Sequence, residues 1–203
     1  MTTQIADRPV VSVADQVIAL VGSAGGLRGF TQVLEQLPGD FEAAIVVVLH
    51  LQAAHPSMLA TILARSSRLP VKQAEAGDVL EAGHVYVAPP DAHLLVAADG
   101  TMQLDNRPPI HFLRPSADVL LESLASTYAG DCLAVVFSGT GSDGAAGAAA
   151  LKDAGGTVLA QDEASSEFFG MPAAAIASGA VAQVLALDRI APALVEFVRP
   201  SLS

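Results

Sequence analysis

The stretch Val17-Ile18-Ala19-Leu20-Val21-Gly22-Ser23-Ala24-Gly25-Gly26 decides the fold of this chain. Its first five residues are apolar, and a glycine ends the run. An apolar run of this length bounded by glycine predicts a buried strand of a parallel sheet. The glycines permit a tight turn into a helix, which we expect over about residues 27–36. This turn places Ser23 beside the free N–H groups of a helix start, as a nucleophile, a phosphate-loop residue or a helix cap.

Further apolar runs and amphipathic segments alternate along the rest of the chain. We predict strands at 44–49, 71–75, 133–137, 157–160 and 182–185, and helices at 56–64, 116–128, 145–153, 172–178 and 190–198. Strands that alternate with helices imply a parallel sheet covered by helices on both faces, with right-handed crossovers. The sequence therefore predicts an α/β fold with a mostly parallel, doubly wound sheet.

The middle of the chain departs from this alternation. Residues 84–88 and 93–97 alternate in polarity around Pro89-Pro90-Asp91, which predicts a small antiparallel hairpin outside the main sheet. Asp99-Gly100 begins another turn, toward residues 102–104. Ser116 is the expected N-cap of the helix that follows. Residues 1–15 are polar and mixed, so we expect a flexible tail followed by one domain over residues 16–203.

Composition narrows the classes of protein to which the chain can belong. The net charge is −11, and the ten lysines and arginines form no cluster, which argues against nucleic acid and anionic membranes as partners. No apolar run approaches the roughly 18 residues of a membrane span. The start of the chain lacks a signal-peptide pattern, and the single Cys132 fits a reducing compartment, so we expect a cytoplasmic protein. No Cys/His spacing suggests a metal site, and we expect no metal or other cofactor.

Three predicted strands are each followed by a polar side chain that suits acyl-transfer chemistry: Ser23, His50 and Asp143. The carboxyl ends of parallel strands meet at one edge of the sheet, where sites of α/β proteins form. A histidine there takes the serine proton, and a carboxylate orients the imidazole and stabilises its charged form. Backbone N–H groups of the two glycine-rich turns are candidates to stabilise an oxyanion. His55, five residues beyond His50, is the alternative base.

Two other interpretations use the same glycine-rich turns. The sequence around Ser23 is not the G-x-S-x-G elbow of α/β-hydrolases, because Val21 replaces the first glycine. The segment 139–144 matches G-x-G-x-x-G between a strand and a helix, and Asp162 lies where a ribose-binding acid is expected. That pattern is typical of a dinucleotide site. Asp143 counts against it, because its negative charge lies where a pyrophosphate needs the positive end of a helix.

Taken together, these segments resemble the catalytic domain of the CheB family of chemotaxis protein-glutamate methylesterases. The resemblance rests on motifs that follow in the order of that family over about residues 16–198. They are Ser23-Ala-Gly-Gly26, Val47-Val-Leu-His50, Gly83-His-Val-Tyr-Val-Ala-Pro89, Arg114-Pro-Ser-Ala-Asp118, Ser138-Gly-Thr-Gly-Ser-Asp-Gly-Ala145, Gln161-Asp-Glu-Ala-Ser165 and Phe169-Gly-Met-Pro172.

The resemblance implies a three-layer α/β/α fold and a catalytic triad. By it, Ser23 is the nucleophile, His50 the general base and acid, and Asp143 the orienting carboxylate. It implies that the turn backbone at Ala24, Thr140 and Gly141 serves the oxyanion. The implied reaction is hydrolysis of glutamate methyl esters on chemoreceptors, with glutamine deamidation as a second activity of many members.

The sequence also departs from the usual pattern of that family. Members usually carry an N-terminal receiver domain, and the roughly fifteen residues before the first strand are too few for one, so we expect no phosphorelay control within this chain. Thr140 stands where the family has a methionine in its Gly-Met-Gly turn. A non-catalytic regulatory or binding module of the same fold stays open as an alternative at this point. The sequence predicts neither the oligomeric state nor the particular receptor.

Overall fold

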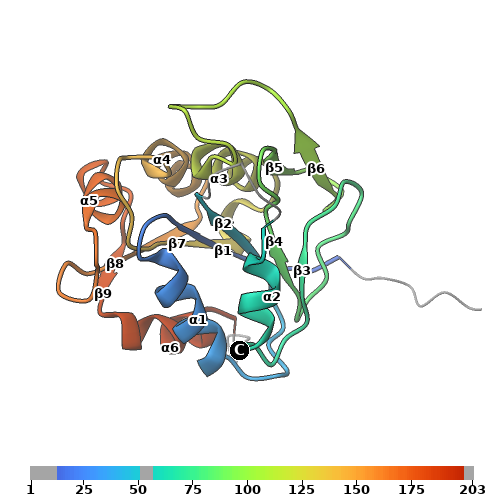
Figure 1. Ribbon diagram of the computed structural model, residues 1–203, viewed down its shortest axis with the longest axis horizontal. Helices are drawn as coiled ribbons and strands as arrows, with labels where there is room; N and C mark the ends of the chain where they lie inside the picture. The colour runs from blue at the N-terminus through green and yellow to red at the C-terminus, as the bar shows by residue number, and fades with distance from the viewer. Residues whose placement is uncertain (1–12, 51–56, 199–203) are drawn as a thin grey trace, which may run out of the picture.

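A seven-stranded parallel sheet forms the centre of the molecule (Figure 1). The computed structural model describes residues 13–50 and 57–198. The strand order is β3-β4-β2-β1-β7-β8-β9, and every neighbouring pair is parallel. The strands are β1 (Val17–Gly22), β2 (Ala44–Leu49), β3 (Val71–Gln73), β4 (Val85–Val87), β7 (Cys132–Val136), β8 (Thr157–Gln161) and β9 (Gln183–Leu185).

Helices cover both faces of this sheet, which gives three layers (Figure 1). One face is covered by α1 (Gly26–Gln36), α2 (Leu59–Ala64) and α6 (Leu187–Val198). The other face is covered by α3 (Ala117–Thr127), α4 (Ala145–Asp153) and α5 (Gly170–Ala177), and a short 3-10 turn, η1 (Ala129–Asp131), leads from α3 into β7. The predicted α/β/α architecture is therefore confirmed.

Alternate residues of the central strands face opposite helical layers, as the two-residue period of a strand requires. On β1, Val17, Ala19 and Val21 belong to the core under α3 and α4. Ile18 and Leu20 belong to the core under α1 and α6. Every residue of β1 is buried, which explains why the sequence shows a continuous apolar run there rather than alternation.

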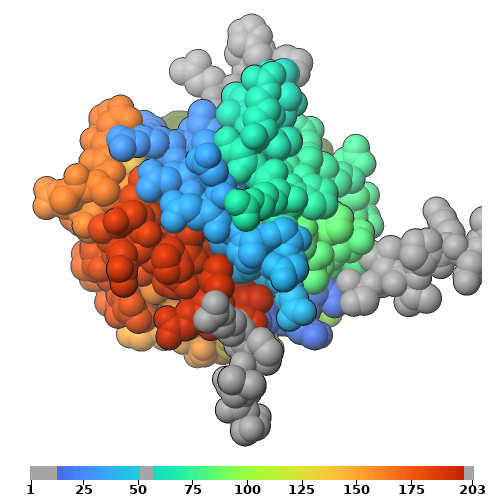
Figure 2. Space-filling model, turned by 90° about the horizontal axis from the view of Figure 1, so that it is seen from below, coloured from blue at the N-terminus to red at the C-terminus, as the bar shows by residue number. Residues whose placement is uncertain are grey.

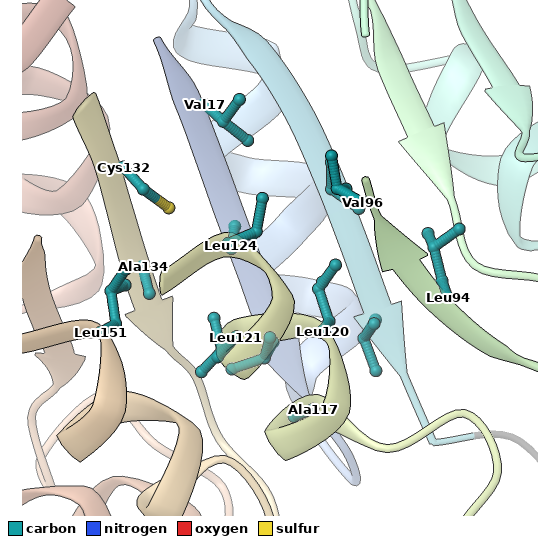
Figure 3. Close-up of a cluster of buried hydrophobic side chains, with 14 of the residues drawn as sticks. Val17, Leu94, Val96, Ala117, Leu120, Leu121, Leu124, Cys132, Ala134 and Leu151 are labelled. Atoms are coloured by element: carbon teal, nitrogen blue, oxygen red, sulfur yellow. The ribbon is translucent and has the colours of Figure 1, made fainter. Parts of the chain in front are cut away.

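Helices α3 and α4 pack closely against each other because α4 has a glycine at the contact. A Cβ atom at Gly147 would lie 2.7 Å from Leu121 Cβ and 2.9 Å from Asp118 Cα, so no larger residue fits. Figure 3 shows Leu120, Leu121 and Leu124 of α3 directed toward the strands of the main sheet. This packing brings the N-terminal ends of α3 and α4 together.

The antiparallel hairpin forms between different segments from those predicted. Strand β4 lies in the main sheet, parallel to β2 and β3. The second sheet pairs β5 (His93–Val96) with β6 (Met102–Asp105), so the chain turns at Asp99-Gly100 rather than at Pro89-Pro90-Asp91. The predicted small antiparallel sheet and the turn at Asp99-Gly100 are therefore confirmed, whereas the predicted pairing of 84–88 with 93–97 was wrong. Polarity alternation does not identify the partner of a strand, and β4 pairs with residues distant in the sequence.

The strand order changes direction at β1, because the other main-sheet strands that precede β7 in sequence lie on one side of β1 and those from β7 onward lie on the other. Helix α1 leads from β1 to β2 on one side, whereas β7 pairs with β1 on the other side and leads through α4 to β8. A crevice forms outside the carboxyl ends of the strands at such a switch point. The turns that carry Ser23 and residues 138–144 follow β1 and β7, so both lie at this edge.

Most of the predicted element positions are confirmed. Strand β2 and helix α4 have the predicted bounds, whereas β3 ends earlier, at Gln73. The predicted start of α2 at Pro56, residues 1–12 of the tail predicted over 1–15, and the last five residues lie outside the described residues. Val13 pairs with Glu81 and Ala14 is buried, so these two residues belong to the fold and not to a tail. Within residues 13–50 and 57–198, no helix combines the length and the apolar character needed to cross a bilayer.

Figure 2 shows the face on which α1 and α6 lie side by side. A groove of about 400 Å³ lies on this face. It is lined by Gln36, Ala191, Pro192, Val195 and Glu196. Helix α1 has 11 residues and is therefore about 16 Å long, so Gln36 at its end is distant from Ser23 at its start. The groove is separate from the predicted site.

We expect Gly29→Ala to destabilise the protein although alanine is the better helix former. A Cβ atom at Gly29 would lie 2.6 Å from Cδ1 of Phe137, a fully buried ring that makes an edge-on contact with Phe30. For a contact this short, the steric cost of overpacking is in the upper part of its usual range, about 2–3 kcal/mol, and exceeds the gain of about 1 kcal/mol in helix propensity. Urea unfolding should show a loss of about 1–2 kcal/mol.

Gly39→Ala is the matched control for this prediction. A Cβ atom there would meet only Arg68 Cβ, at an ordinary 3.9 Å, so the free energy of unfolding should change by less than about 0.5 kcal/mol. A Gly29→Ala variant as stable as the wild type would contradict the packing argument.

Candidate active site

Ser23 begins a tight turn between β1 and α1. Its N–H donates a hydrogen bond to the carbonyl oxygen of Ser138 at 3.0 Å, and its own carbonyl oxygen accepts one from the N–H of Gly26 at 2.8 Å. Gly25 lies between them with φ of 80°, in the left-handed region that favours glycine. The side chain of Ser23 is half-buried, and the neighbouring Ala24 is exposed. The predicted strand–turn–helix setting of Ser23 is confirmed.

The turn at Ser23 packs directly against the turn that follows β7. A Cβ atom at Gly139 would lie 2.9 Å from Ser23 Cβ and 2.3 Å from Met171 Sδ. A Cβ atom at Gly25 would lie 2.5 Å from Ser138 Oγ. Glycine at both positions therefore lets the two turns approach each other at van der Waals distance.

His50 lies beside Ser23 at the end of the neighbouring strand. Its N–H donates to the carbonyl oxygen of Gly22 at 3.2 Å, which continues the β1–β2 register by one residue. Its Nε2 lies 2.6 Å from Oδ2 of Asp143. The His50 side chain is 7% exposed and that of Asp143 is 1% exposed, so water hardly reaches the pair.

Asp143 sits at the N-terminal end of α3, although α4 is the helix that follows it in sequence. The N–H groups of Ala117 and Asp118 donate to its carboxylate at 2.6 and 3.2 Å, and Ser116 Oγ donates at 2.7 Å. Free N–H groups and the helix dipole make a helix start a favourable place for an anion. The carboxylate of Asp143 is therefore the cap of α3.

Two opposing effects act on the pKa of Asp143. Burial alone raises it, because a carboxylate loses its hydration in the interior. The hydrogen bonds from His50, Ser116 and the Ala117 N–H outweigh burial and lower the pKa of Asp143 to about 2. Asp143 is therefore ionised at neutral pH, as an orienting carboxylate must be.

Asp118 caps α4 in the same way that Asp143 caps α3. Its Oδ1 accepts hydrogen bonds from the N–H groups of Gly144 and Gly147, both at 2.8 Å. Burial raises the pKa of Asp118, and the nearby charge of Asp143 raises it further, against the hydrogen bonds that it accepts. Asp118, which belongs to α3, thus caps α4, and Asp143, which precedes α4, caps α3. These two contacts fix the turn that carries Asp143.

These contacts contradict the dinucleotide interpretation of residues 139–144. The start of α4, where a pyrophosphate would bind, is filled by the carboxylate of Asp118. The N–H of Gly139 donates to Phe168 O. Asp162, the expected ribose ligand, accepts hydrogen bonds from the N–H and Oγ of Ser165.

Sequence reasoning missed several polar residues that hold these turns. Gln161 is buried, accepts a hydrogen bond from the Ser138 N–H at 2.9 Å, and donates to Ser165. Ser138 Oγ donates to the Ala24 carbonyl oxygen and accepts from the Phe168 N–H. The signals of this network in the sequence are the glutamine at the end of β8 and the two family motifs that contain Ser138, Gln161 and Ser165.

The structure brings together most of the predicted site. Asp143 contacts His50, whereas Ser23 Oγ makes no hydrogen bond to any of the described residues. Across the same described ranges, the N–H groups of Ala24, Thr140 and Gly141 also donate no hydrogen bond, which leaves them available to a ligand. The alternative base, His55, lies outside the described residues.

Residues 13–50 and 57–198 contain no group of three or more His, Cys, Asp or Glu side chains arranged to hold a metal ion. Cys132 is fully buried within β7, and burial raises the pKa of its thiol. This thiol therefore packs in the core, at the end of β7 away from the site.

We expect Asp143 to contribute to stability above its folded-state pKa and to lose that contribution in acid. Its pKa is 3.8 in the absence of interactions and about 2 in the folded protein. The contribution, about 2 kcal/mol, is thus complete above pH 4 and disappears as the pH falls through 2. Urea unfolding between pH 7 and 2 should show a smaller pH dependence for Asp143→Asn than for the wild type.

Asp118→Asn is the matched variant, for which we expect no loss of stability at neutral pH. An amide oxygen still accepts the N–H groups of Gly144 and Gly147, and the cost of a second buried carboxyl group beside the ionised Asp143 is removed. Stability at pH 7 should therefore stay constant or rise. Equal losses of stability in both variants at neutral pH would contradict this assignment of charges.

Comparisons with known proteins show the family to which the chain is similar. Residues 18–194 match the family model described as CheB methylesterase. The chain is 45% identical over 184 residues to protein-glutamate methylesterase/protein-glutamine glutaminase 2 of Anaeromyxobacter dehalogenans, covering 91% of this chain and 54% of that protein. It is 38% identical over 182 residues to protein-glutamate methylesterase FrzG of Myxococcus xanthus, covering 90% of this chain and 54% of that protein.

A solved structure supports the same relationship. The crystal structure of the CheB methylesterase catalytic domain of Thermotoga maritima superposes with a TM-score of 0.87 and 37% identity, over 93% of this chain and all of that one. This chain spans about half the length of the curated relatives that it matches. The match covers the whole central sheet and the turns that carry Ser23, His50 and Asp143. The chain belongs to the CheB methylesterase family.

Proposed function

We propose that this chain is a serine hydrolase that cleaves glutamate methyl esters on a methylated chemoreceptor or a related signalling protein in the cytoplasm. The observation that carries the proposal is the contact of 2.6 Å between His50 Nε2 and Asp143 Oδ2, at the strand end beside Ser23. A buried imidazole held by an ionised carboxylate is the arrangement that activates a serine. The names of the relatives, which are methylesterases, support the substrate class.

In the proposed mechanism the two nitrogens of His50 have different partners. Asp143 occupies Nε2, so Nδ1 is the nitrogen left to accept the proton of Ser23. Among the described residues, Ser23 Oγ and His50 Nδ1 are not hydrogen-bonded, and we expect substrate binding to bring them together. Catalytic hydrogen bonds often tighten only in the complex with substrate.

The reaction proceeds in two halves through an acyl-enzyme. Ser23 Oγ attacks the ester carbonyl carbon while His50 takes its proton, and the resulting oxyanion accepts hydrogen bonds from the N–H groups of Ala24, Thr140 and Gly141. The C–O bond to the methoxy group breaks, and His50 protonates the leaving group to give methanol. Water then attacks the acyl-enzyme with His50 as base, which releases the glutamate and regenerates Ser23.

The same acyl-enzyme supports deamidation as a second activity. The relative from Anaeromyxobacter is named a protein-glutamine glutaminase as well as a methylesterase. In deamidation the leaving group is ammonia instead of methanol, and the water-dependent half of the reaction is identical. One serine and one oxyanion site therefore serve both substrates.

We expect Ser23→Ala to lower methanol release from a methylated receptor by at least about a thousandfold, because it removes the nucleophile. Ammonia release from receptor glutamines should fall with it. Ser142→Ala is the matched control, since this serine lies in the neighbouring turn with an exposed side chain. Wild-type methanol release by Ser23→Ala would overturn the mechanism, and no release by the folded wild type would favour a non-catalytic module.

We also expect the rate of methanol release to fall as the pH is lowered, because the proposed mechanism requires the neutral imidazole of His50. A protonated imidazole of His50 cannot accept the proton of Ser23. The pH–rate profile should be measured with circular dichroism over the same range, so that loss of fold is separated from loss of activity. A rate that does not change with pH while the protein stays folded would contradict the role of His50.

A further inference from the structure

A line of buried hydrogen bonds continues from Asp143 away from the proposed nucleophile. Ser116 Oγ donates to Asp143 Oδ1 at 2.7 Å, and the N–H of Ser116 donates to His93 Nδ1 at 3.2 Å. His93 Nε2 lies 3.3 Å from the carbonyl oxygen of Pro108. His93 and Ser116 are both 0% exposed. Neither side chain takes part in the mechanism given above.

The contacts of His93 determine where its proton lies. Nδ1 accepts the N–H of Ser116, so it carries no proton. The proton is therefore on Nε2, from which it points to Pro108 O. The ring is thus a neutral imidazole with both nitrogens paired, which is the state in which a histidine can be buried without a charged partner.

Ser116 does not act as an ordinary N-cap. An N-cap serine usually accepts a hydrogen bond from a backbone N–H in the first turn of its helix. The hydroxyl of Ser116 makes no such bond, and the N–H groups of Ala117 and Asp118 are bound by Asp143 instead. Because the hydroxyl donates rather than accepts, helix capping does not explain why a serine stands at this position.

We propose that Ser116 is a positioning residue for Asp143 and that His93 in turn fixes Ser116. This inference rests on the proposed function. Asp143 Oδ2 accepts hydrogen bonds from His50 Nε2 and from the Ala117 N–H, and the bonds at Oδ1 complete the set that fixes the rotation of the carboxylate about its Cβ–Cγ bond. Removal of the Ser116 hydroxyl leaves Oδ1 with the longer bond from the Asp118 N–H, at 3.2 Å. The carboxylate then orients and stabilises the His50 imidazolium less well.

The position of His93 explains how the second sheet contributes to the site. His93 is the first residue of β5, and β5 packs on α3, where Leu94 and Val96 lie near Leu120 (Figure 3). The β5–β6 sheet therefore holds a fixed hydrogen-bond acceptor at the start of α3. This contact links the small antiparallel sheet to a carboxylate in the main crevice.

The test compares kcat for methanol release in Ser116→Ala, in Ser116→Thr and in a variant that lacks another serine hydroxyl of α3. Loss of one hydrogen bond to a charged group should lower kcat for methanol release about 10- to 100-fold, with KM changed less than about twofold. Ser116→Thr keeps the hydroxyl and should recover most of kcat. Ser126→Ala is the matched control, because Ser126 Oγ bonds only to the Glu122 carbonyl oxygen on the exposed side of the helix.

The role of His93 is tested by His93→Asn and His93→Leu, of which only Asn carries a hydrogen-bond acceptor. Asn carries an oxygen close to the position of Nδ1 and can still accept the Ser116 N–H, whereas Leu cannot. We expect His93→Leu to lower kcat about as much as Ser116→Ala, and His93→Asn to lower it less. Equal kcat values for His93→Asn and His93→Leu would overturn the role of His93.

A spectroscopic measurement separates this inference from the proposed function. The proton shared by His50 Nε2 and Asp143 should give a downfield proton NMR signal, which Ser116→Ala should shift or broaden and Ser126→Ala should leave unchanged. An unchanged signal and unchanged kcat in folded Ser116→Ala would overturn the inference, as would a kcat loss that Thr does not restore. If Ser23→Ala keeps full activity, the proposed mechanism fails, while the NMR comparison still tests Ser116.

Discussion

The carboxylate of Asp143 is the group on which the rest of the site depends. A buried anion is unfavourable unless donors replace its lost hydration, and here the start of α3, Ser116 and His50 supply those donors. One group therefore caps a helix and holds the imidazole that lies beside Ser23. Because the same atoms do both, any movement of α3 against the turn after β7 also changes the position of the proposed base.

The crossed caps between α3 and α4 explain why that movement is restricted. Asp118 binds the start of α4 while Asp143 binds the start of α3, and Gly147 lets the two helices approach closely. The carboxylate of Asp118 also occupies the start of α4, which is where α/β folds with a glycine-rich turn bind phosphate. The turn 139–144, whose sequence matches a nucleotide-binding motif, thus holds Asp143 in place.

A second network leaves the backbone of the serine turn available. Ser138 and Gln161 use their side chains to fix the carbonyl oxygen of Ala24 and the turn after β7, while the N–H groups of Ala24 and Thr140 donate to none of the described residues. Preorganised N–H groups of this kind stabilise a developing oxyanion without reorganisation during the reaction. The departure from the family pattern at Thr140 leaves its N–H, the group that this role needs, in place.

The sequence by itself determined the α/β class, the order of most strands and helices, and the positions of Ser23, His50 and Asp143 at strand ends, because these follow from local apolar runs and glycine turns. It failed for the hairpin, since a strand's own pattern does not name its partner and β4 pairs in the main sheet. Only the tertiary structure decided which donors surround Asp143. Ser116, Asp118 and His93 reach the site through helix and sheet packing, and contacts between distant segments leave no periodic signal in the sequence.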